Sequence, residues 1–336
     1  MDTHNSSITG HADADQDARY DVVVVGGAAA GLSGALTLAR ARRRVAVIDA
    51  GAPRNAAAGH VHSYLGREGS TPADLYADGR EEVRGYGGTV LAGSVEDISR
   101  TEDGRFSVQL ADGRQLRARK ILAATGVTDE LPPVPGLVER WGRDVLHCPF
   151  CHGWEVRDEP IGILAVDLGA AMHQALLWRQ WSDDVVLFLG DAGEPDAAQA
   201  AKLGARGIRV VRGQVTAVEG APGAPVVLMA DGERVQRRAV VVLTRLQARA
   251  GYLAGLGLQP VDQVANGLNF GTAVPAGPTG ATSVPGVYAA GNLAAPMIQV
   301  LPAAAAGLAA AAAITAELMM EEVDAAVAGA AAAAAG

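Results

Sequence analysis

The chain contains two cysteines, Cys148 and Cys151, three positions apart in the segment CPFCH. The CxxC spacing permits a reversible disulfide and can lower the pKa of one thiol, so the pair could be a redox-active dithiol. Three alternatives are open: half of a zinc site, a pair of inert buried thiols, and attachment of c-type haem, whose signature is CxxCH. No second cysteine pair exists to complete a zinc site, and no export signal accompanies a haem motif. We therefore favour the redox pair and expect no metal.

His152 directly follows the second cysteine. An imidazole titrates near neutral pH and suits proton transfer beside a dithiol, although a hydrogen-bonded structural histidine is the alternative. Two further histidines, His60 and His62, follow a candidate cofactor-binding segment, and they either line the same pocket or lie on a loop surface. The sequence thus predicts Cys148, Cys151 and His152 as the catalytic residues.

The elements expected near the N-terminus form a dinucleotide-binding βαβ unit. A valine-rich strand over residues 20–25 leads through a Gly/Ala turn, residues 26–31, into a helix over 32–42, and a second buried strand ends at Asp49. Such a turn lets a pyrophosphate approach the backbone, while the terminal acid binds ribose hydroxyls and repels a 2′-phosphate. The unit predicts FAD or NAD rather than NADP, although Ala28 replaces the middle glycine of GxGxxG.

The same plan recurs later in the chain. After the cysteines, strand, helix and strand patterns again follow one another, and each half contains a hairpin around an Asp-Gly pair and a further buried strand. This repetition predicts an α/β fold of two Rossmann-like domains with three-layer ββα architecture. The later elements expected are strands over 120–124, 161–166, 185–189, 239–243 and 286–290, hairpins over 106–117 and 226–235, and helices over 170–179 and 303–320.

Composition argues against several classes of partner. The 336 residues carry a net charge of -9 without a basic stripe, so nucleic-acid binding is not expected. The apolar stretch over 303–314 is too short to span a bilayer, and residues 1–19 are polar, without a signal-peptide pattern. These features predict a soluble cytoplasmic protein with no membrane partner. Residues 323–336 form an Ala-rich tail to which we assign no function.

Several of these segments together resemble the low-molecular-weight thioredoxin reductase family. They are the turn at 26–31 with Asp49, the strand end Ala124-Thr125-Gly126, the CxxC pair, and the segment PGVYAAGN at 285–292 followed by Gln299. The resemblance covers residues 20–322. It implies an FAD domain built from residues 19–130 and 262–322, an inserted NAD(P)-type domain over 131–261, a disordered tail over 1–18, and a homodimer.

The resemblance also implies roles for single residues. Cys151 faces the flavin, and Cys148 exchanges with the substrate. Asn292 occupies a position where the family has an aspartate, but an asparagine can still hydrogen-bond a ribityl hydroxyl or a phosphate. The implied FAD contacts are Gly26, Gly27, Ala28, Ala30, Gly31, Asp49, Ala124, Thr125, Gly126, Gly291, Asn292, Gln299 and Val300.

The inserted domain departs from the family where NADPH is bound. The segment AVDLG, residues 165–169, supplies no glycine for the close approach, and Asp167 would repel the pyrophosphate. After the next strand the family has a basic cluster for the 2′-phosphate, whereas residues 189–194 contain two acids and no basic residue. A retained fold with a lost nicotinamide site, together with CxxCH, is similar to the FAD-dependent dithiol oxidases of the gliotoxin and holomycin type.

That similarity implies an activity. A small substrate dithiol would reduce the Cys148–Cys151 disulfide, the electrons would pass to FAD, and O2 would accept them to give H2O2. The alternatives are a disulfide reductase driven by NADPH or by another donor such as ferredoxin, and a flavin redox sensor without turnover. Because no nicotinamide has to be admitted, we expect the inserted domain to stay docked on the flavin without rotating.

Overall fold

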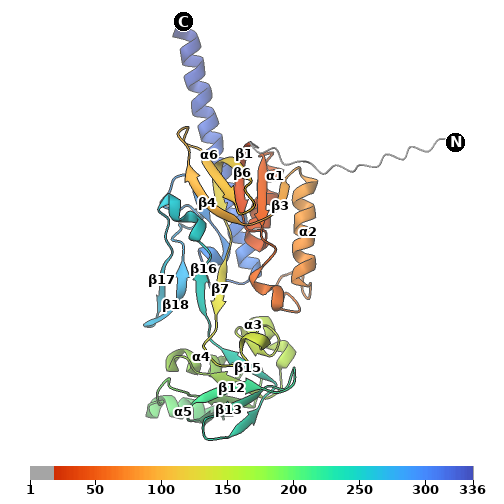
Figure 1. Cartoon of the computed structure of the whole chain (residues 1–336), viewed down its shortest axis with the longest axis vertical. Helices are drawn as coiled ribbons and strands as arrows, with labels where there is room; N and C mark the ends of the chain where they lie inside the picture. Colours follow the sequence, from red (N-terminus) through yellow and green to blue (C-terminus); the bar gives the residue numbers. More distant parts are fainter. Residues whose placement is uncertain (1–18, 336) are drawn as a thin grey trace, which may run out of the picture.

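The computed structural model describes residues 19–335, so the tail expected over 1–18 lies outside the described residues. The chain forms two α/β domains, one above the other in Figure 1, and the second is inserted into the first. Strands β7 (Val127–Glu130) and β16 (Arg245–Ala248) run between them as the outgoing and returning connections.

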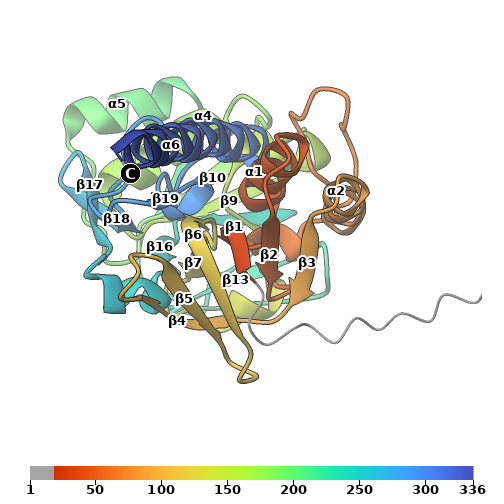
Figure 2. The ribbon, with the colours of Figure 1, turned by 90° about the horizontal axis from the view of Figure 1, so that it is seen from above.

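A seven-stranded sheet with the order β3-β2-β1-β6-β5-β4 is the centre of the first domain, and β19 pairs with β6 beside this path. The strands β1, β2, β3, β6 and β19 are parallel, which buries both faces. Helices α1, α2 and α6 cover one face (Figure 2), while the short helix η4 (Gly251–Leu256) packs against the other. The bounds are β1 (Arg19–Val25), α1 (Ala29–Arg40), β2 (Val45–Asp49), α2 (Pro72–Gly85), β3 (Thr89–Ala92), β4 (Val95–Arg100), β5 (Phe106–Leu110), β6 (Gln115–Ala123), β19 (Val287–Ala289) and α6 (Val300–Ala335).

The second domain repeats this layering around a five-stranded parallel sheet with the order β11-β10-β9-β15-β8. Helices α4 and α5 lie on one face, and a three-stranded antiparallel sheet, β12-β13-β14, covers the other. The cysteine pair lies on the short helix α3, which leads into η3. The bounds are β8 (Val145–Leu146), α3 (Pro149–His152), η3 (Trp154–Val156), β9 (Ile161–Leu164), α4 (Leu168–Trp178), β10 (Val185–Phe188), α5 (Ala197–Ala205), β11 (Arg209–Val211), β12 (Val215–Glu219), β13 (Val226–Met229), β14 (Arg234–Gln236) and β15 (Ala239–Val242).

A four-stranded sheet with the order β17-β18-β16-β7 shows where the chain returns to the first domain. β16 pairs antiparallel with β7, and η4, which follows β16, packs into the core of the first domain. The chain therefore returns to the first domain between β15 and β16, and the boundary expected at residue 261 is too late. β17 (Val261–Ala265) and β18 (Leu268–Ala273) pair antiparallel and belong to the same sheet as β16.

The expected strands and helices are present, most with ends that differ by one to three residues, and two differ more in length. The strand expected over 120–124 is the end of β6, because the second arm of the 106–117 hairpin continues without a break into the parallel sheet. The final helix is longer than 303–320, since α6 runs through the Ala-rich segment that we expected to be a tail. Alanine has the highest helix propensity, so this segment forms helix without an amphipathic pattern.

The length of α6 overturns the argument that excluded a membrane. At 36 residues the helix is long and apolar enough to cross a bilayer by length and composition. A core helix passes the same test, and the first half of α6 packs against α1 in the core. The second half projects away from both domains in Figure 1.

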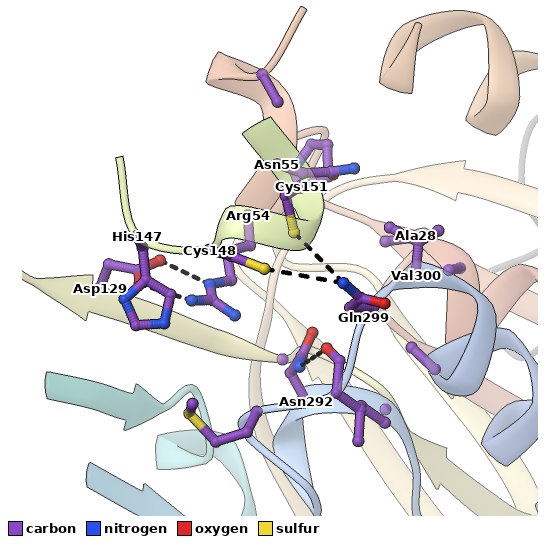
Figure 3. A pocket seen from close by; sticks show the side chains of 18 of the residues that line it. Ala28, Arg54, Asn55, Asp129, His147, Cys148, Cys151, Asn292, Gln299 and Val300 are labelled. Carbon is purple, nitrogen blue, oxygen red and sulfur yellow. Dashed lines mark hydrogen bonds and ion pairs between the residues drawn. The ribbon is translucent and has the colours of Figure 1, made fainter. Parts of the chain in front are cut away.

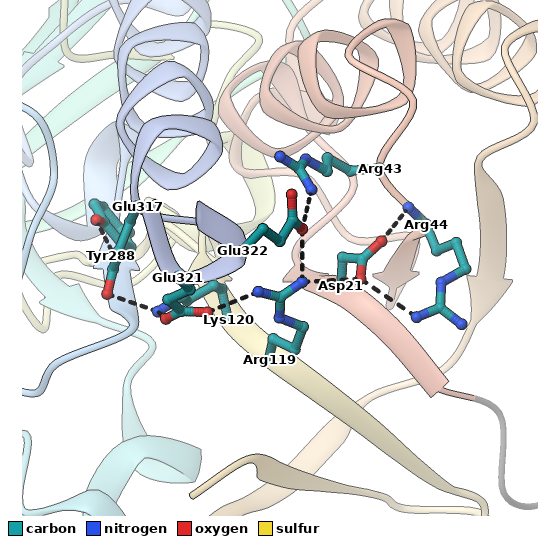
Figure 4. A network of polar contacts seen from close by, with 9 residues as sticks. All are labelled: Asp21, Arg43, Arg44, Arg119, Lys120, Tyr288, Glu317, Glu321 and Glu322. Atoms are coloured by element: carbon teal, nitrogen blue, oxygen red, sulfur yellow. Dashed lines mark hydrogen bonds and ion pairs between the residues drawn. The ribbon is translucent and has the colours of Figure 1, made fainter. Parts of the chain in front are cut away.

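A polar network fixes the middle of α6 to the sheet (Figure 4). Lys120 on β6 is almost fully buried and pairs with Glu317 and Glu321 of the helix. Arg119 reaches Glu321 at 2.8 Å and Glu322 at 2.9 Å. A buried ammonium group is tolerated only when it is paired, so these carboxylates account for the position of Lys120.

Candidate active site

A cavity of about 1510 Å³ lies between the two domains and gathers residues that are distant in sequence. Pockets for small ligands usually measure about 300–1,000 Å³, so this cavity is larger than a usual small-ligand pocket. Figure 3 shows the cysteines of α3 facing the loop before α6 across this space. Every residue predicted for the site lines the cavity, except Gly31.

The turn after β1 leaves the N-terminus of α1 open to a ligand. Its N-cap residue, Ala28, makes no side-chain hydrogen bond, so the first backbone N–H groups are available to an anion. Gly26 has a φ of +112°, and a Cβ there would lie 2.4 Å from the carbonyl oxygen of Ala124. A Cβ on Gly27 would lie 2.3 Å from Cγ of Asp49. Gly26 and Gly27 thus let the turn pack against Ala124 and Asp49, and the uncapped N-terminus of α1 beside them fits the pyrophosphate of FAD.

Gly31 has a packing function and does not face the ligand. A Cβ at this position would lie 1.8 Å from the carbonyl oxygen of Gly26, so only glycine lets α1 approach β1. The carboxylate of Asp49 ends β2 as expected for a ribose ligand. Its Oδ1 accepts the N–H of Gly51 at 2.8 Å, and its Oδ2 lies 3.4 Å from Arg80.

The flavin end of the cavity is closed by the loop before α6. Nδ2 of Asn292 donates to the carbonyl oxygens of Pro296 and Ile298, both at 2.8 Å, and so fixes this loop. The remaining Oδ1 can accept a hydrogen bond from a ribityl hydroxyl, but it cannot bond a phosphate, which has no donor at neutral pH. Of the two partners expected for Asn292, a ribityl hydroxyl and a phosphate, these contacts leave the ribityl hydroxyl.

The two thiols lie at the start of α3 and share one polar partner. Nε2 of Gln299 is 3.8 Å from Sγ of Cys148 and 3.7 Å from Sγ of Cys151. A hydrogen bond from Cys151 lowers the pKa of Cys148 most, burial opposes this, and Gln299 together with backbone N–H groups of α3 lowers it further. The same interaction with Cys148, together with burial, raises the pKa of Cys151. Cys148 is therefore the thiolate of the reduced pair and the stronger nucleophile.

His152 is half-buried beside the pair, and both of its ring nitrogens are buried. Neither Nδ1 nor Nε2 has a hydrogen-bond partner among the described residues. Burial lowers the pKa of His152, which keeps the imidazole neutral at physiological pH. A neutral ring has one donor and one acceptor to offer to a ligand. The alternative of a hydrogen-bonded structural histidine finds no support in these contacts.

A buried ion pair at the cavity wall was not predicted from the sequence. Arg54 holds Asp129 with two hydrogen bonds of 2.7 Å, and Thr244 donates to the same carboxylate at 2.7 Å. Asp129 belongs to β7 and Thr244 precedes β16, so the pair ties the two interdomain connections to the loop after β2. No motif marks these residues, and only the long-range fold brings them together.

All five histidines of the described part of the chain line this cavity. They are His60, His62, His147, His152 and His173. His60 and His62 are therefore pocket residues, and their rings lie 6.0 Å apart. Within residues 19–335 no three His, Cys, Asp or Glu side chains converge as a metal ion would require.

In the corresponding turn of the second domain, the side chain of Asp167 already bonds the N-terminus of the following helix. Asp167 is the N-cap of α4, and its Oδ1 accepts the N–H of Ala170 at 2.9 Å. After β10, Asp191 accepts hydrogen bonds from Gln214, and Glu194 pairs with Arg212 at 3.0 Å. Carboxylates thus occupy both places where a nucleotide cofactor would present phosphate.

An open dinucleotide cradle and a dithiol that face one cavity define a flavin-dependent disulfide oxidoreductase. Comparison with known proteins agrees. The sequence profile of "Pyridine nucleotide-disulphide oxidoreductase" matches residues 20–312, and the chain belongs to this family. The protein is accordingly an FAD-binding oxidoreductase with a thioredoxin reductase-like fold.

Two fungal relatives and one solved structure illustrate the similarity. Thioredoxin reductase sirT of Leptosphaeria maculans is 30% identical over 311 residues, 88% of this chain and 93% of the relative. Thioredoxin reductase tcpT of Claviceps purpurea is 32% identical over 288 residues, 81% of this chain and 86% of the relative. The crystal structure of HlmI matches with a TM-score of 0.85 at 43% identity, over 94% of this chain and 97% of that chain.

Proposed function

We propose that the protein is an FAD-dependent oxidase of a small dithiol, with O2 as the electron acceptor and H2O2 as the second product. The observation that carries this proposal is the contrast between the two nucleotide-type turns. The first turn is open to a pyrophosphate, whereas Asp167 caps the second and two acids follow β10. Without a nicotinamide to supply electrons, the dithiol substrate itself must be the reductant.

Each of the cavity residues below has a separate role in the proposed reaction. A substrate thiolate attacks Sγ of Cys148 in the oxidised pair, which releases the thiolate of Cys151. The second substrate thiol then displaces Cys148, so the substrate leaves as a disulfide and the enzyme holds two electrons. Gln299 can hydrogen-bond either sulfur, and His152 can accept a proton because it is neutral. The turn around Gly26 and Gly27 would hold FAD, which would supply a two-electron acceptor for the reduced pair beside Cys151 and the reactivity with O2.

The inserted domain remains docked throughout this cycle. Three contacts cross between the domains near the dithiol: Gln299 with both sulfurs, His62 with Glu155 at 3.4 Å, and Gly142 with Ala57. A Cβ on Gly142 would lie 2.7 Å from that of Ala57, so the backbones approach closely. Detection of a populated rotated state, for instance by distance measurements between labels on the two domains, would contradict this part of the proposal.

Anaerobic reduction of the bound flavin tests the function. The holoenzyme is mixed separately with NADPH and with dithiothreitol while the absorbance of oxidised flavin is followed. We expect bleaching by the dithiol only, with colour returning in air and one H2O2 formed per dithiol. The variants Cys148→Ser and Cys151→Ser should resist bleaching by dithiol but still bleach on photoreduction, which shows that their flavin is intact. Rapid bleaching by NADPH would overturn the proposal.

A second candidate is a thioredoxin reductase-like disulfide reductase. The names of sirT and tcpT favour it, since both are called thioredoxin reductases. This candidate requires a reductant other than the dithiol, either NADPH bound by a divergent site or another donor. The same experiment separates the two, because a reductase is bleached by its donor and reoxidised by a disulfide substrate.

A further inference from the structure

Arg249 lines the cavity between the domains and has no acidic partner among the described residues. Its Nε donates to the hydroxyl of Thr128 at 2.9 Å, and its Nη1 donates to the carbonyl oxygen of Ala52 at 2.9 Å. Two of the five guanidinium N–H groups are used in this way, which leaves three without a partner within residues 19–335. Because arginine is always charged in proteins, this side chain brings an unpaired positive charge to the cavity wall.

The other charged side chains of the cavity do not offer this charge to an anion. Among the described residues that line it are two arginines and no lysine. The second arginine, Arg54, donates from Nε and Nη2 to the two carboxylate oxygens of Asp129, so its charge is already balanced. The remaining acids of the lining, Asp49 and Asp167, repel an anion. Arg249 is therefore the arginine of this lining that can pair with a bound anion.

The backbone of Arg249 is bonded to the strand end that packs against the glycine turn. Its N–H donates to the carbonyl oxygen of Gly126 at 3.0 Å, and its carbonyl oxygen accepts the hydroxyl of Thr125 at 2.7 Å. Thr125 adjoins the turn, because a Cβ on Gly26 would lie 3.0 Å from its backbone nitrogen. Only one residue therefore separates Arg249 from the turn that fits the pyrophosphate.

The guanidinium group of Arg249 reaches the loop that carries the ribose ligand. Its acceptor Ala52 follows Asp49 by three positions, and a Cβ on Gly27 of the turn would lie 2.3 Å from Cγ of Asp49. The turn, the strand end and this loop surround one part of the cavity, and Arg249 is bonded to two of the three. A dinucleotide with its pyrophosphate at the turn and its ribose at Asp49 occupies this part of the cavity.

We propose that Arg249 binds the pyrophosphate of FAD and supplies the full positive charge that the glycine turn lacks. The N-terminus of α1 contributes only about half an elementary charge, whereas each phosphate of FAD carries a negative charge. The planar fork of a guanidinium group matches phosphate oxygens. The bonds to Thr128 and Ala52 hold this fork in place before the cofactor arrives, which reduces the entropy lost on binding. The proposal concerns the cofactor alone and applies equally to an oxidase and to a reductase.

Binding of FAD, ADP and adenosine to the apoprotein separates the phosphates from the rest of the cofactor. FAD is titrated through its fluorescence, and ADP and adenosine are measured by competition with FAD. In Arg249→Gln at low salt we expect the dissociation constants of FAD and ADP to rise about tenfold, while that of adenosine, which has no phosphate, stays as in the wild type. Because Arg249 is exposed, about 0.5 M salt should narrow the difference between variant and wild type.

Two further variants control for net charge and for folding. Arg245 lies on β16, is exposed, pairs with Asp262 at 3.7 Å and does not line the cavity, so Arg245→Gln should bind all three ligands as the wild type does. Arg249→Met keeps most of the aliphatic stem without any donor and should lose as much FAD affinity as Arg249→Gln. In urea denaturation we expect the apoproteins to unfold at similar midpoints and added FAD to stabilise the two Arg249 variants less than the wild type.

Three results would overturn the proposal. Unchanged FAD affinity in both Arg249 variants would mean that the guanidinium group only ties Ala52 to Thr128. An equal loss of affinity for FAD, ADP and adenosine would place this group against the adenine ring instead. Salt provides a test that needs no variant, because FAD affinity of the wild type that does not fall between about 0.05 and 0.5 M salt would contradict a charge pair at the pyrophosphate.

Discussion

Helix α1 follows β1, and helix α4 follows β9 in the second domain, and their N-termini differ in how the first backbone N–H groups are used. At α1 the N-cap Ala28 makes no side-chain hydrogen bond. At α4 the N-cap Asp167 accepts the N–H of Ala170 at 2.9 Å. A capping carboxylate and a pyrophosphate compete for the same donors and repel each other. The comparison teaches that two Rossmann-type units can satisfy the same helix end differently, one leaving its N–H groups to a ligand and the other bonding them with its own carboxylate.

Transferring the cap to the first unit should have the largest effect. In Ala28→Asp a carboxylate occupies the place of the pyrophosphate, and we expect FAD affinity to fall by roughly a hundredfold, since opposed like charges cost several kcal/mol. The ratio of FAD to protein after purification and a titration of the apoprotein with FAD measure this. The matched variant Ala28→Gly restores the usual glycine and should keep its FAD. Full FAD content in Ala28→Asp would show that α1 is not the pyrophosphate site.

Adding one methyl group to the turn of each unit tests the same difference between the two helix N-termini. In Gly27→Ala the new Cβ would lie 2.3 Å from Cγ of Asp49, so this ribose ligand must move, and we expect FAD affinity to fall by about tenfold. In Gly169→Ala the new Cβ would lie 3.3 Å from Oδ1 of Asp167, which needs only a small adjustment. The second variant should therefore bind FAD as the wild type does. Equal losses of FAD in both variants would erase the distinction between the two units.

The second unit still positions the dithiol, and the acidity of its thiols can be measured. Hydrogen bonds from Cys151 and Gln299 lower the pKa of Cys148, so in the reduced enzyme its thiolate persists to lower pH than that of a free cysteine. We expect iodoacetamide to alkylate Cys148 first, roughly tenfold faster at pH 7 than a free thiol. Gln299→Leu should move the midpoint of the pH profile upward. Peptide mass spectrometry identifies the site, and first alkylation at Cys151 would reverse our assignment of the two thiols.

Removal of the cap from the second unit should have the smallest effect. Asp167→Ala leaves the first turn of α4 without its side-chain acceptor, and we expect a loss of about 1 kcal/mol in the free energy of unfolding. Urea denaturation of the apoprotein measures this, while FAD content should not change. The cap of α5, Asp196, provides a positive control, because Asp196→Ala breaks a capping box of known geometry. A gain in NADPH binding by Asp167→Ala would indicate that the acid is the main barrier to the nucleotide.

Features that depend on contacts within a few residues could be predicted from the sequence. The turn at 26–31 with the acid at Asp49 predicted FAD or NAD, and the CxxC pair favoured a redox dithiol over zinc, haem or inert thiols, whereas FAD itself was implied by the family resemblance. The lack of a glycine for close approach in residues 165–169 and of a basic residue in residues 189–194 was equally visible. Each depends on contacts between chain neighbours, such as an N-cap with the N–H three residues later. The length of α6 could not be predicted in this way, because an alanine run carries no periodic signal that marks where the helix ends.

The cavity itself was decided by the tertiary structure. Gln299 meets Cys151 across 148 positions of sequence, and Arg54 meets Asp129 across 75. His62 and Glu155 come from different domains, and neither lies in a motif. Such contacts depend on how the sheets and their connections pack, which no local pattern specifies. The sequence, with its resemblance to a known family, therefore predicted the cofactor and the candidate sulfur pair, while the packing of the two domains decided what surrounds the sulfurs.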